Sequence, residues 1–342
     1  MAILYIEGFE GFGTSANMRY RYKGTSTANQ SNIVTGRDGS GKAIYMDFGS
    51  AIWYFDMPGG ESAANLIVGC GFQIANSMVN SDVLSFYDTG GVTEQVVLRS
   101  TAAGELAVDR GATQLGITSG LGLLTNVWYY LEIDVTFGDA TAGSVEVFLN
   151  DSSVLSLTGI DTRTTAGENC GFVGLKANTS GPRVFDDLYI LDDQGTDQTT
   201  RIGPCIVETV FPDANGTTNN FTPSAGSNYQ NVDEGDTPDD DTTYNSSSTV
   251  THKDLYGHAA LTGSIDTVYA VMPRSYVRVS EAGGRGVKPV ARSNVTEVDG
   301  TERFIDQSYV YVDEVYENDP NGGGAWTESS VNAAEFGIKI TT

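Results

Sequence analysis

The 342-residue sequence has few of the side chains that usually carry metal or nucleophilic chemistry: three cysteines and two histidines. Cys70, Cys170 and Cys205 lie far apart and form no Cys-x-x-Cys pair, so neither a zinc site nor a disulfide framework is indicated. We expect reduced thiols and folding in a cytosolic compartment. His252 and His258 both fall near a long polar region, which does not favour a Ser–His–Asp triad.

Basic residues are also scarce. The chain has 19 Lys and Arg against 44 Asp and Glu, a formal net charge of −25. Such a surface repels phosphate, so we expect no nucleic-acid partner. No apolar run approaches the roughly 18 residues of a membrane helix. The first residues lack the basic and apolar regions of a signal peptide. We therefore expect no membrane span, and release by lysis rather than by secretion.

Helical periodicity is missing, and alternation with a period of two dominates the first part of the chain. In Tyr129–Phe137 the odd positions are apolar and the even positions mostly polar, as in a half-buried antiparallel strand. Turn sequences such as Asn150-Asp151-Ser152 fit tight hairpins. The sequence therefore predicts an all-β protein.

The length of the chain fits two domains. We predict an N-terminal sandwich of two antiparallel sheets over residues 1–195 and a linker over 196–204. A smaller, β-sandwich-like C-terminal domain is predicted over 205–342. Its expected opening strand is Cys205–Phe211, and long polar loops follow over 213–251.

The ordered strands of the first domain resemble the concanavalin A-like (laminin G-like) jelly roll of lectins, glucanases and many phage structural proteins. The likeness rests on Ile6-Glu7-Gly8-Phe9-Glu10, Gly104–Val108, Trp128–Ile133, Ser144–Asp151 and Phe185–Ile190. It implies that the closing strand returns beside the N-terminal strand. The second domain, around Pro212–Gly216 and Ala325–Ile338, resembles small C-terminal β-modules of phage minor structural proteins.

The pairing of these two modules favours a bacteriophage virion structural protein, a fibre or decoration component of the tail or capsid. We expect it to fold in the host cytoplasm and to contact other virion proteins and host surface polysaccharide. A homo-oligomer, taken as a trimer, is the expected assembly. Two alternatives stay open, a carbohydrate-binding adhesin and a polysaccharide hydrolase, because this fold hosts both binding and catalysis.

Glucanases of this fold carry three acids as Glu-x-Asp-x-x-Glu on one strand. Here Glu132 and Asp134 match the first two positions, whereas Phe137 takes the last and has no proton to give. We therefore predict a non-enzymatic protein. Glu132 and Asp134 are interpreted as solvent-facing acids able to contact a sugar, and Trp53 and Tyr54 as aromatic rings able to stack on it.

No cofactor is predicted, and calcium is the one open candidate, because carboxylate oxygens are its preferred ligands. Six acids fall within the nine residues of the acidic segment, residues 233–241. They are Asp233, Glu234, Asp236, Asp239, Asp240 and Asp241. A second group is Asp186, Asp187, Asp192 and Asp193. The alternative in both places is a solvated acidic loop.

Overall fold

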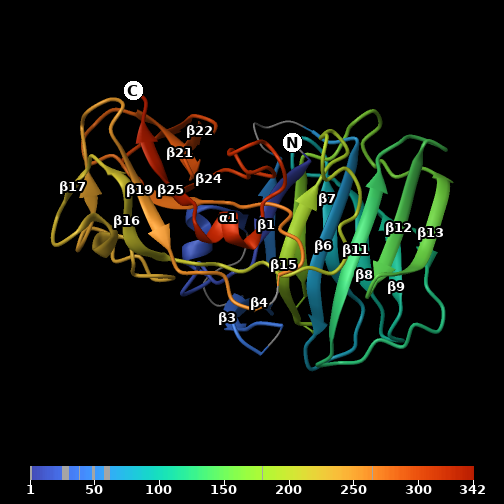
Figure 1. Ribbon diagram of the computed structural model, residues 1–342. Coiled ribbons are helices and arrows are strands. Elements are labelled where there is room, and N and C mark those ends of the chain that lie inside the picture. The colour runs from blue at the N-terminus through green and yellow to red at the C-terminus, as the bar shows by residue number, and fades with distance from the viewer. Residues whose placement is uncertain are drawn as a thin grey trace. The chain divides into compact units, whose positions relative to one another are not determined.

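The computed structural model describes residues 2–24, 31–37, 39–47, 51–57, 62–178, 180–263 and 265–342. The chain is built from strands and forms two compact units, Met1–Val207 and Glu208–Thr342 (Figure 1). The prediction of an all-β protein in two parts is confirmed. Residues 196–204, predicted as a linker, belong to the first unit. Across the described ranges, no helix has the length and apolar character needed to cross a membrane.

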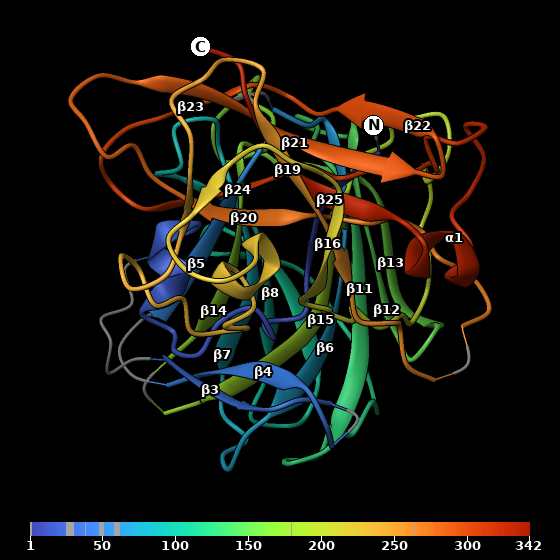
Figure 2. The same ribbon diagram turned by 60° about the vertical axis from the view of Figure 1, so that its left-hand side comes forward.

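The first unit is a sandwich of two antiparallel sheets. The eight-stranded sheet has the order β13 (Ser152–Ile160), β12 (Gly143–Leu149), β11 (Trp128–Thr136), β6 (Asn65–Ile74), β15 (Arg183–Leu191), β4 (Lys42–Met46) and β3 (Ser31–Thr35), with β1 (Ile3–Glu7) paired to β15. The seven-stranded sheet has the order β10 (Thr113–Ile117), β9 (Leu106–Arg110), β8 (Glu94–Ser100), β7 (Ser81–Tyr87), β14 (Phe172–Ala177), β5 (Ala51–Asp56) and β2 (Lys23–Gly24). Figure 2 shows β5, β7, β8 and β14 on one side and β6, β11, β12 and β15 on the other.

Alternating side chains fill the space between the two sheets. In β11, Leu131, Ile133 and Val135 are fully buried, as the period of two predicts. The closing strand β15 lies antiparallel to β1, with Ile3 opposite Leu191, so it returns beside the N-terminal strand as the resemblance implied. The three cysteines are free thiols.

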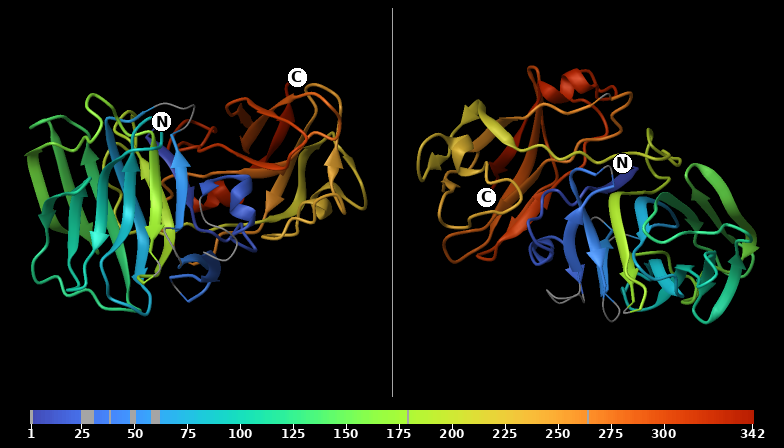
Figure 3. Two further views of the ribbon diagram at one scale, coloured as in Figure 1. Left: turned by 180° about the vertical axis from the view of Figure 1, so that it is seen from behind. Right: turned by 90° about the horizontal axis from the view of Figure 1, so that it is seen from below.

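The second unit is centred on a six-stranded antiparallel sheet, drawn in yellow to red in Figure 3. Its order is β16 (Pro212–Asn219), β19 (Lys253–His258), β25 (Glu335–Ile340), β21 (Arg285–Ser293) and β22 (Thr296–Asp299), with β23 (Arg303–Ile305) paired to β21. Two short ribbons join β17 (Thr222–Pro223) to β18 (Asn245–Ser246) and β20 (Arg274–Val277) to β24 (Val310–Asp313). The short helices are η1 (Asn17–Tyr20) in the first unit, and η3 (Asn228–Asn231) and α1 (Glu328–Asn332) in the second.

The segment Cys205–Phe211 is not a strand, contrary to the sequence prediction. Its first residues lie against the eight-stranded sheet, where the backbone N–H of Val207 donates to the Asp187 carboxylate at 2.8 Å. The Val207 backbone therefore bonds to a side chain of that sheet instead of joining a strand ladder, while Ile206 is exposed. The first strand of the second unit is β16 instead, which is mostly polar.

Candidate functional site

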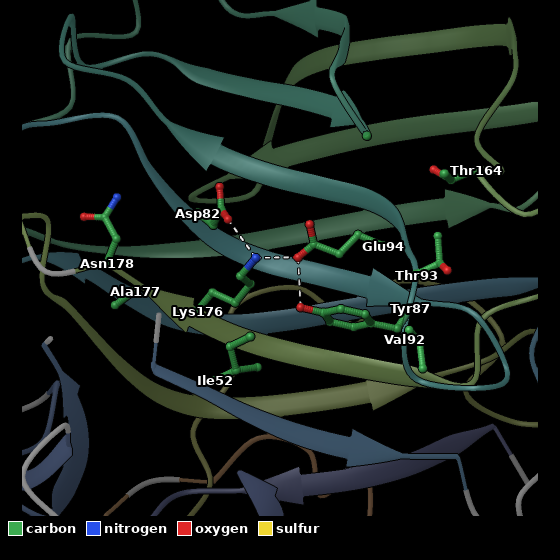
Figure 4. Close-up of a pocket in the computed structure, with 11 residues that line it drawn as sticks. Ile52, Asp82, Tyr87, Val92, Thr93, Glu94, Thr164, Lys176, Ala177 and Asn178 are labelled. Carbon is green, nitrogen blue, oxygen red and sulfur yellow. Dashed lines mark hydrogen bonds and ion pairs between the residues drawn. The ribbon is translucent and has the colours of Figure 1, made fainter. Parts of the chain in front are cut away.

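A cavity of about 550 Å³ opens on the outer face of the seven-stranded sheet. Strand β14 shows which face this is, because Val173 and Leu175 are fully buried between the sheets and Lys176, the next residue, lines the cavity. The lining comes from β5, β7, β8, β14 and the connecting turns (Figure 4). Its polar members are Asp82, Tyr87, Thr93, Glu94, Thr164, Lys176 and Asn178.

Four of these side chains form one connected cluster, which we call the Lys176 cluster: Asp82, Tyr87, Glu94 and Lys176. The Lys176 ammonium lies 2.7 Å from the Asp82 carboxylate and also contacts Glu94. The Tyr87 hydroxyl donates to the same Glu94 carboxylate at 2.8 Å. Figure 4 shows the ammonium between the two acids, with the Tyr87 hydroxyl on the same Glu94 oxygen that the ammonium contacts.

The contacts within the cluster set its protonation. Burial alone would lower the pKa of Lys176, but its hydrogen bonds to Asp82 and Glu94 raise it above its ordinary value. Burial would raise the pKa of Glu94, yet the bond from Lys176 lowers it. Burial, followed by the neighbouring Glu94 charge, raises the pKa of Tyr87. At neutral pH the cluster therefore holds an ammonium, an ionised Glu94 and a protonated phenol.

Local backbone features aim these side chains outward. The register of β7 against β8 shifts between Asp82 and Leu84 and again between Phe86 and Tyr87, as at β-bulges. On the neighbouring strand β14, Gly174 leaves room for the Tyr87 ring, because a Cβ at this position would lie 3.2 Å from Tyr87 Cε2.

The turn between β7 and β8 forms the rim of the cavity. The Asp88 carboxylate accepts from the backbone N–H of Val92 at 3.0 Å and of Thr93 at 3.2 Å. Burial would raise the pKa of Asp88, but these backbone bonds lower it. Gly91 has a φ of 66°, which suits glycine at this tight turn. The turn thus holds Thr93 and Glu94 at the edge of the site.

The two aromatic residues predicted to stack on a sugar, Trp53 and Tyr54, face opposite sides of their sheet. Trp53 is 1% exposed and points into the sandwich, so it is not available to stack on a ligand. Tyr54 alternates to the outer face, where its ring packs edge-on against Tyr87 with 5.1 Å between centroids. One of the two predicted aromatic contacts therefore borders the cavity, and the other belongs to the core.

The acids Glu132 and Asp134 lie on the outer face of the other sheet, where Asp134 is half-buried. Glu132 is fully buried. Its carboxylate accepts from the Tyr189 hydroxyl at 2.5 Å, from the Gly203 backbone at 2.9 Å and from Arg201 at 2.6 Å. Asp134 accepts from the Asn65 amide at 3.0 Å, and burial raises its pKa.

Residues 201–207, which we call the strap, cover this face. The Arg201 guanidinium lies 4.2 Å from the centroid of the Phe148 ring, and the Cys205 thiol lies 3.0 Å from the Tyr130 hydroxyl. Burial, with the nearby Asp187 and Glu132 charges, raises the pKa of the Cys205 thiol to about 12, although the hydrogen bond to Tyr130 lowers it, so the thiol stays protonated. The expectation of a sugar-contacting Glu132 is corrected: the strap occupies the surface that a ligand would need.

The acidic segment does not gather its carboxylates around one point. The Asp241 carboxylate pairs with Arg278 at 2.7 Å, and this bond lowers its pKa. Glu234 and Asp239 both accept from the Thr243 hydroxyl at 2.8 Å. Among the described residues, no group of three or more histidine, cysteine or acidic side chains is placed to hold a metal ion.

The second acidic group is also engaged with protein partners. Arg37 donates from its backbone to Asp186 and from its guanidinium to Asp187, each at 2.7 Å. Burial and the neighbouring Asp187 raise the pKa of Asp186. Asp192 accepts from the backbone of Gln194 at 3.0 Å, after β15 has ended.

Sequence reasoning missed the Lys176 cluster. Asp82, Glu94 and Lys176 lie on three strands and span 94 positions of the chain, so no local motif joins them. The sequence offers one signal, Lys176 itself, a lysine that alternates with the apolar Val173 and Leu175.

No protein-family model matches the chain, and no curated protein sequence does. Among solved structures, the alginate lyase Aly36B is similar with a TM-score of 0.41 and 14% identity, over 55% of this chain and 96% of that one. The cellulose-induced protein Cip1 gives 0.41 and 15%, over 55% and 95%. A carbohydrate esterase of the Shiga toxin-encoding bacteriophage phi24B gives 0.35 and 14%, over 55% and 99%.

These likenesses concern the fold, and no residue role is carried over from them. They do correct the expectation of a non-enzymatic protein, because alginate and glucuronan lyases stand among the similar structures. The sequence argument had excluded one arrangement of three acids on one strand. It did not address an acid–base cluster assembled from several strands.

Proposed function

We propose that this chain binds a polysaccharide on the outer face of the seven-stranded sheet, at the cavity around the Lys176 cluster. The observation that carries the proposal is the set of donors and acceptors that converge there. Lys176 and Tyr87 donate hydrogen bonds, and Asp82 and Glu94 accept them. Sugar hydroxyls need both kinds of partner, and the half-buried Tyr54 ring beside them offers a surface for sugar C–H groups.

A second candidate function is hydrolysis of the bound polysaccharide. General acid–base catalysis needs a proton donor and a base within reach of one bond. Tyr87 keeps its proton because its pKa is raised, and it lies 2.8 Å from the ionised Glu94 carboxylate. Asp82 adds a second carboxylate on the other side of Lys176. Glycoside hydrolysis commonly uses two carboxyl groups that flank the scissile bond.

The proposed setting is the surface of a bacteriophage particle, with the polysaccharide on the host cell. This rests on the resemblance of the two modules to phage structural proteins. The trimer, the contacts with other virion proteins and the release by lysis belong to the same proposal. The test is to purify phage particles by density gradient from lysates of cells that carry the gene for this protein. An antibody against the protein should detect it in those particles. An absence from purified particles that retain their other proteins would contradict the setting and leave the binding proposal intact.

Binding is tested by affinity electrophoresis of the full chain against a panel of polysaccharides, with reducing ends measured in the same samples. We expect retardation by at least one polymer, and a loss of about tenfold or more for Lys176→Met, because hydrogen bonds to charged groups contribute about 1.5–3 kcal/mol. Tyr54→Ala is the second variant, since it removes a half-buried ring without breaking an ion pair. Tyr244→Ala, an exposed tyrosine of the second unit, is the matched control.

Retention of no polysaccharide by the folded protein, or equal retention of all four proteins, would overturn the proposal. The appearance of new reducing ends that depends on Glu94 and Tyr87 would support hydrolysis. Binding without new reducing ends would exclude hydrolysis and leave the binding function.

A further inference from the structure

The cavity carries more acid than base. Its lining holds one cation, Lys176, and two carboxylates, Asp82 and Glu94. Both carboxylates contact the Lys176 ammonium. The raised pKa of Lys176 and the lowered pKa of Glu94 keep these charges in place at neutral pH. The ammonium is therefore already matched, and one negative charge is left over.

We infer that the polysaccharide bound at this cavity is uncharged where it crosses the Lys176 cluster: a neutral glycan rather than a polyuronate or a sulfated polymer. The inference rests on the proposed function and names the chemical class of its ligand. The Asp82 and Glu94 carboxylates already contact Lys176, so an anionic sugar that reached the ammonium would lie beside both of them and be repelled. A neutral hydroxyl donates to those carboxylates without breaking either ion pair.

The neighbouring surface of the same sheet supports this reading of the charge. Arg99 lies opposite Asp82 in the register of β8 against β7. Its guanidinium is held by two hydrogen bonds to Asp109, at 2.8 and 3.3 Å. Arg99 is therefore also matched by a carboxylate and is not available to an anionic polymer.

The aromatic residues of this face are compatible with the same class of ligand. Tyr54 on β5 and Phe172 on β14 are both half-buried, so part of each ring reaches the surface. Stacking of a sugar on a ring uses C–H groups and needs no charge on the sugar. At the sheet edge, the exposed Lys23 lies 5.3 Å from the centroid of the Phe172 ring, outside the cavity lining.

The test compares each neutral polysaccharide of the panel with the same polymer oxidised at C6 to carboxylates. We expect the full chain to bind the neutral member at least about fivefold more tightly, the effect of one unit charge repelled at close range in water. The variant Asp82→Asn/Glu94→Gln leaves Lys176 unmatched and should reduce or reverse this preference. The variant Asp213→Asn/Asp266→Asn removes the same charge from two exposed sites of the second unit and should leave it unchanged.

Tighter binding of the carboxylated member by the wild-type protein would overturn the inference and leave the proposed function standing. An equal shift in the two double variants would also overturn it, because the preference would then reflect net charge rather than the cluster. If the folded protein binds neither member of any pair, both the proposed function and this inference are contradicted. Calorimetry on each variant confirms that it is folded.

Discussion

Replacement of Glu132 by Gln should destabilise the first unit far more than a surface carboxylate change would. The side chain is fully buried and accepts three hydrogen bonds, two of them from Gly203 and Arg201 of the strap. Each bond to a charged group contributes about 1.5–3 kcal/mol. Arg201 is 25% exposed, so solvent screens part of its share. Gln keeps the volume of the side chain and one acceptor oxygen. We therefore expect the free energy of unfolding to fall by about 2–4 kcal/mol.

Urea unfolding followed by tryptophan fluorescence measures this loss, because Trp53 and Trp128 both report on the first unit. Glu146→Gln on the neighbouring strand β12 is the control and should change stability by no more than about 0.5 kcal/mol. Trypsin gives an independent readout, because a released strap exposes the bond after Arg201. If Glu132→Gln unfolds like Glu146→Gln and is cleaved no faster at Arg201, the strap is not anchored as we describe.

Two further predictions concern the stability of the first unit. Gly69→Ala should destabilise it by about 1–3 kcal/mol, since overpacking has that cost and the new Cβ would lie 2.1 Å from Tyr189 Cε1. Gly90→Ala has 3.6 Å to its nearest atom and should have little effect in the same urea titration. Burial raises the pKa of Glu10 from its ordinary 4.5 to about 8, so the folded chain holds this proton to higher pH than the unfolded chain does. Stability should therefore fall as pH rises between those two values, and calorimetry across this window should show a flatter profile for Glu10→Gln; an equal slope in both proteins would contradict the assignment.

Alternation in polarity predicted strands whose two faces differ in burial. Alternation identified Tyr129–Phe137, most of which lies in β11, with Leu131, Ile133 and Val135 in the core. It missed β13, because Ser152–Ile160 lies at a sheet edge, where both of its faces are largely exposed. Backbone hydrogen bonds to β12 hold β13 in place. Such bonds need no alternation of polar and apolar side chains, so the sequence does not reveal the strand.

The candidate site was harder to predict for two physical reasons. The run Ile52–Phe55 is apolar throughout, so alternation could not say that Trp53 faces the core and Tyr54 the surface. The Lys176 cluster forms because β7, β8 and β14 are neighbours in one sheet. The order of strands in a sheet cannot be predicted from the sequence of any single segment. For Glu132 the predicted face was correct, but the strap that covers it comes from residues expected to be the end of the linker and the start of the next domain.

The two outer faces of the sandwich differ, one with the cavity and the other covered in part by the strap, and this difference leads to a last prediction. Packed sheets lie about 10 Å apart, with core side chains between them. The Lys176 cluster and the pair Glu132 and Asp134 are therefore separated by the full core. Asp134→Asn and Glu132→Gln should leave polysaccharide binding within about twofold of the wild type, measured below any unfolding transition, whereas Lys176→Met weakens it; a factor of two is under about 0.5 kcal/mol, the usual range for substitutions away from a site. If Asp134→Asn abolished binding while the protein stayed folded, the ligand would lie on the strap side, and the sequence-based interpretation of Glu132 and Asp134 would return in place of the cavity.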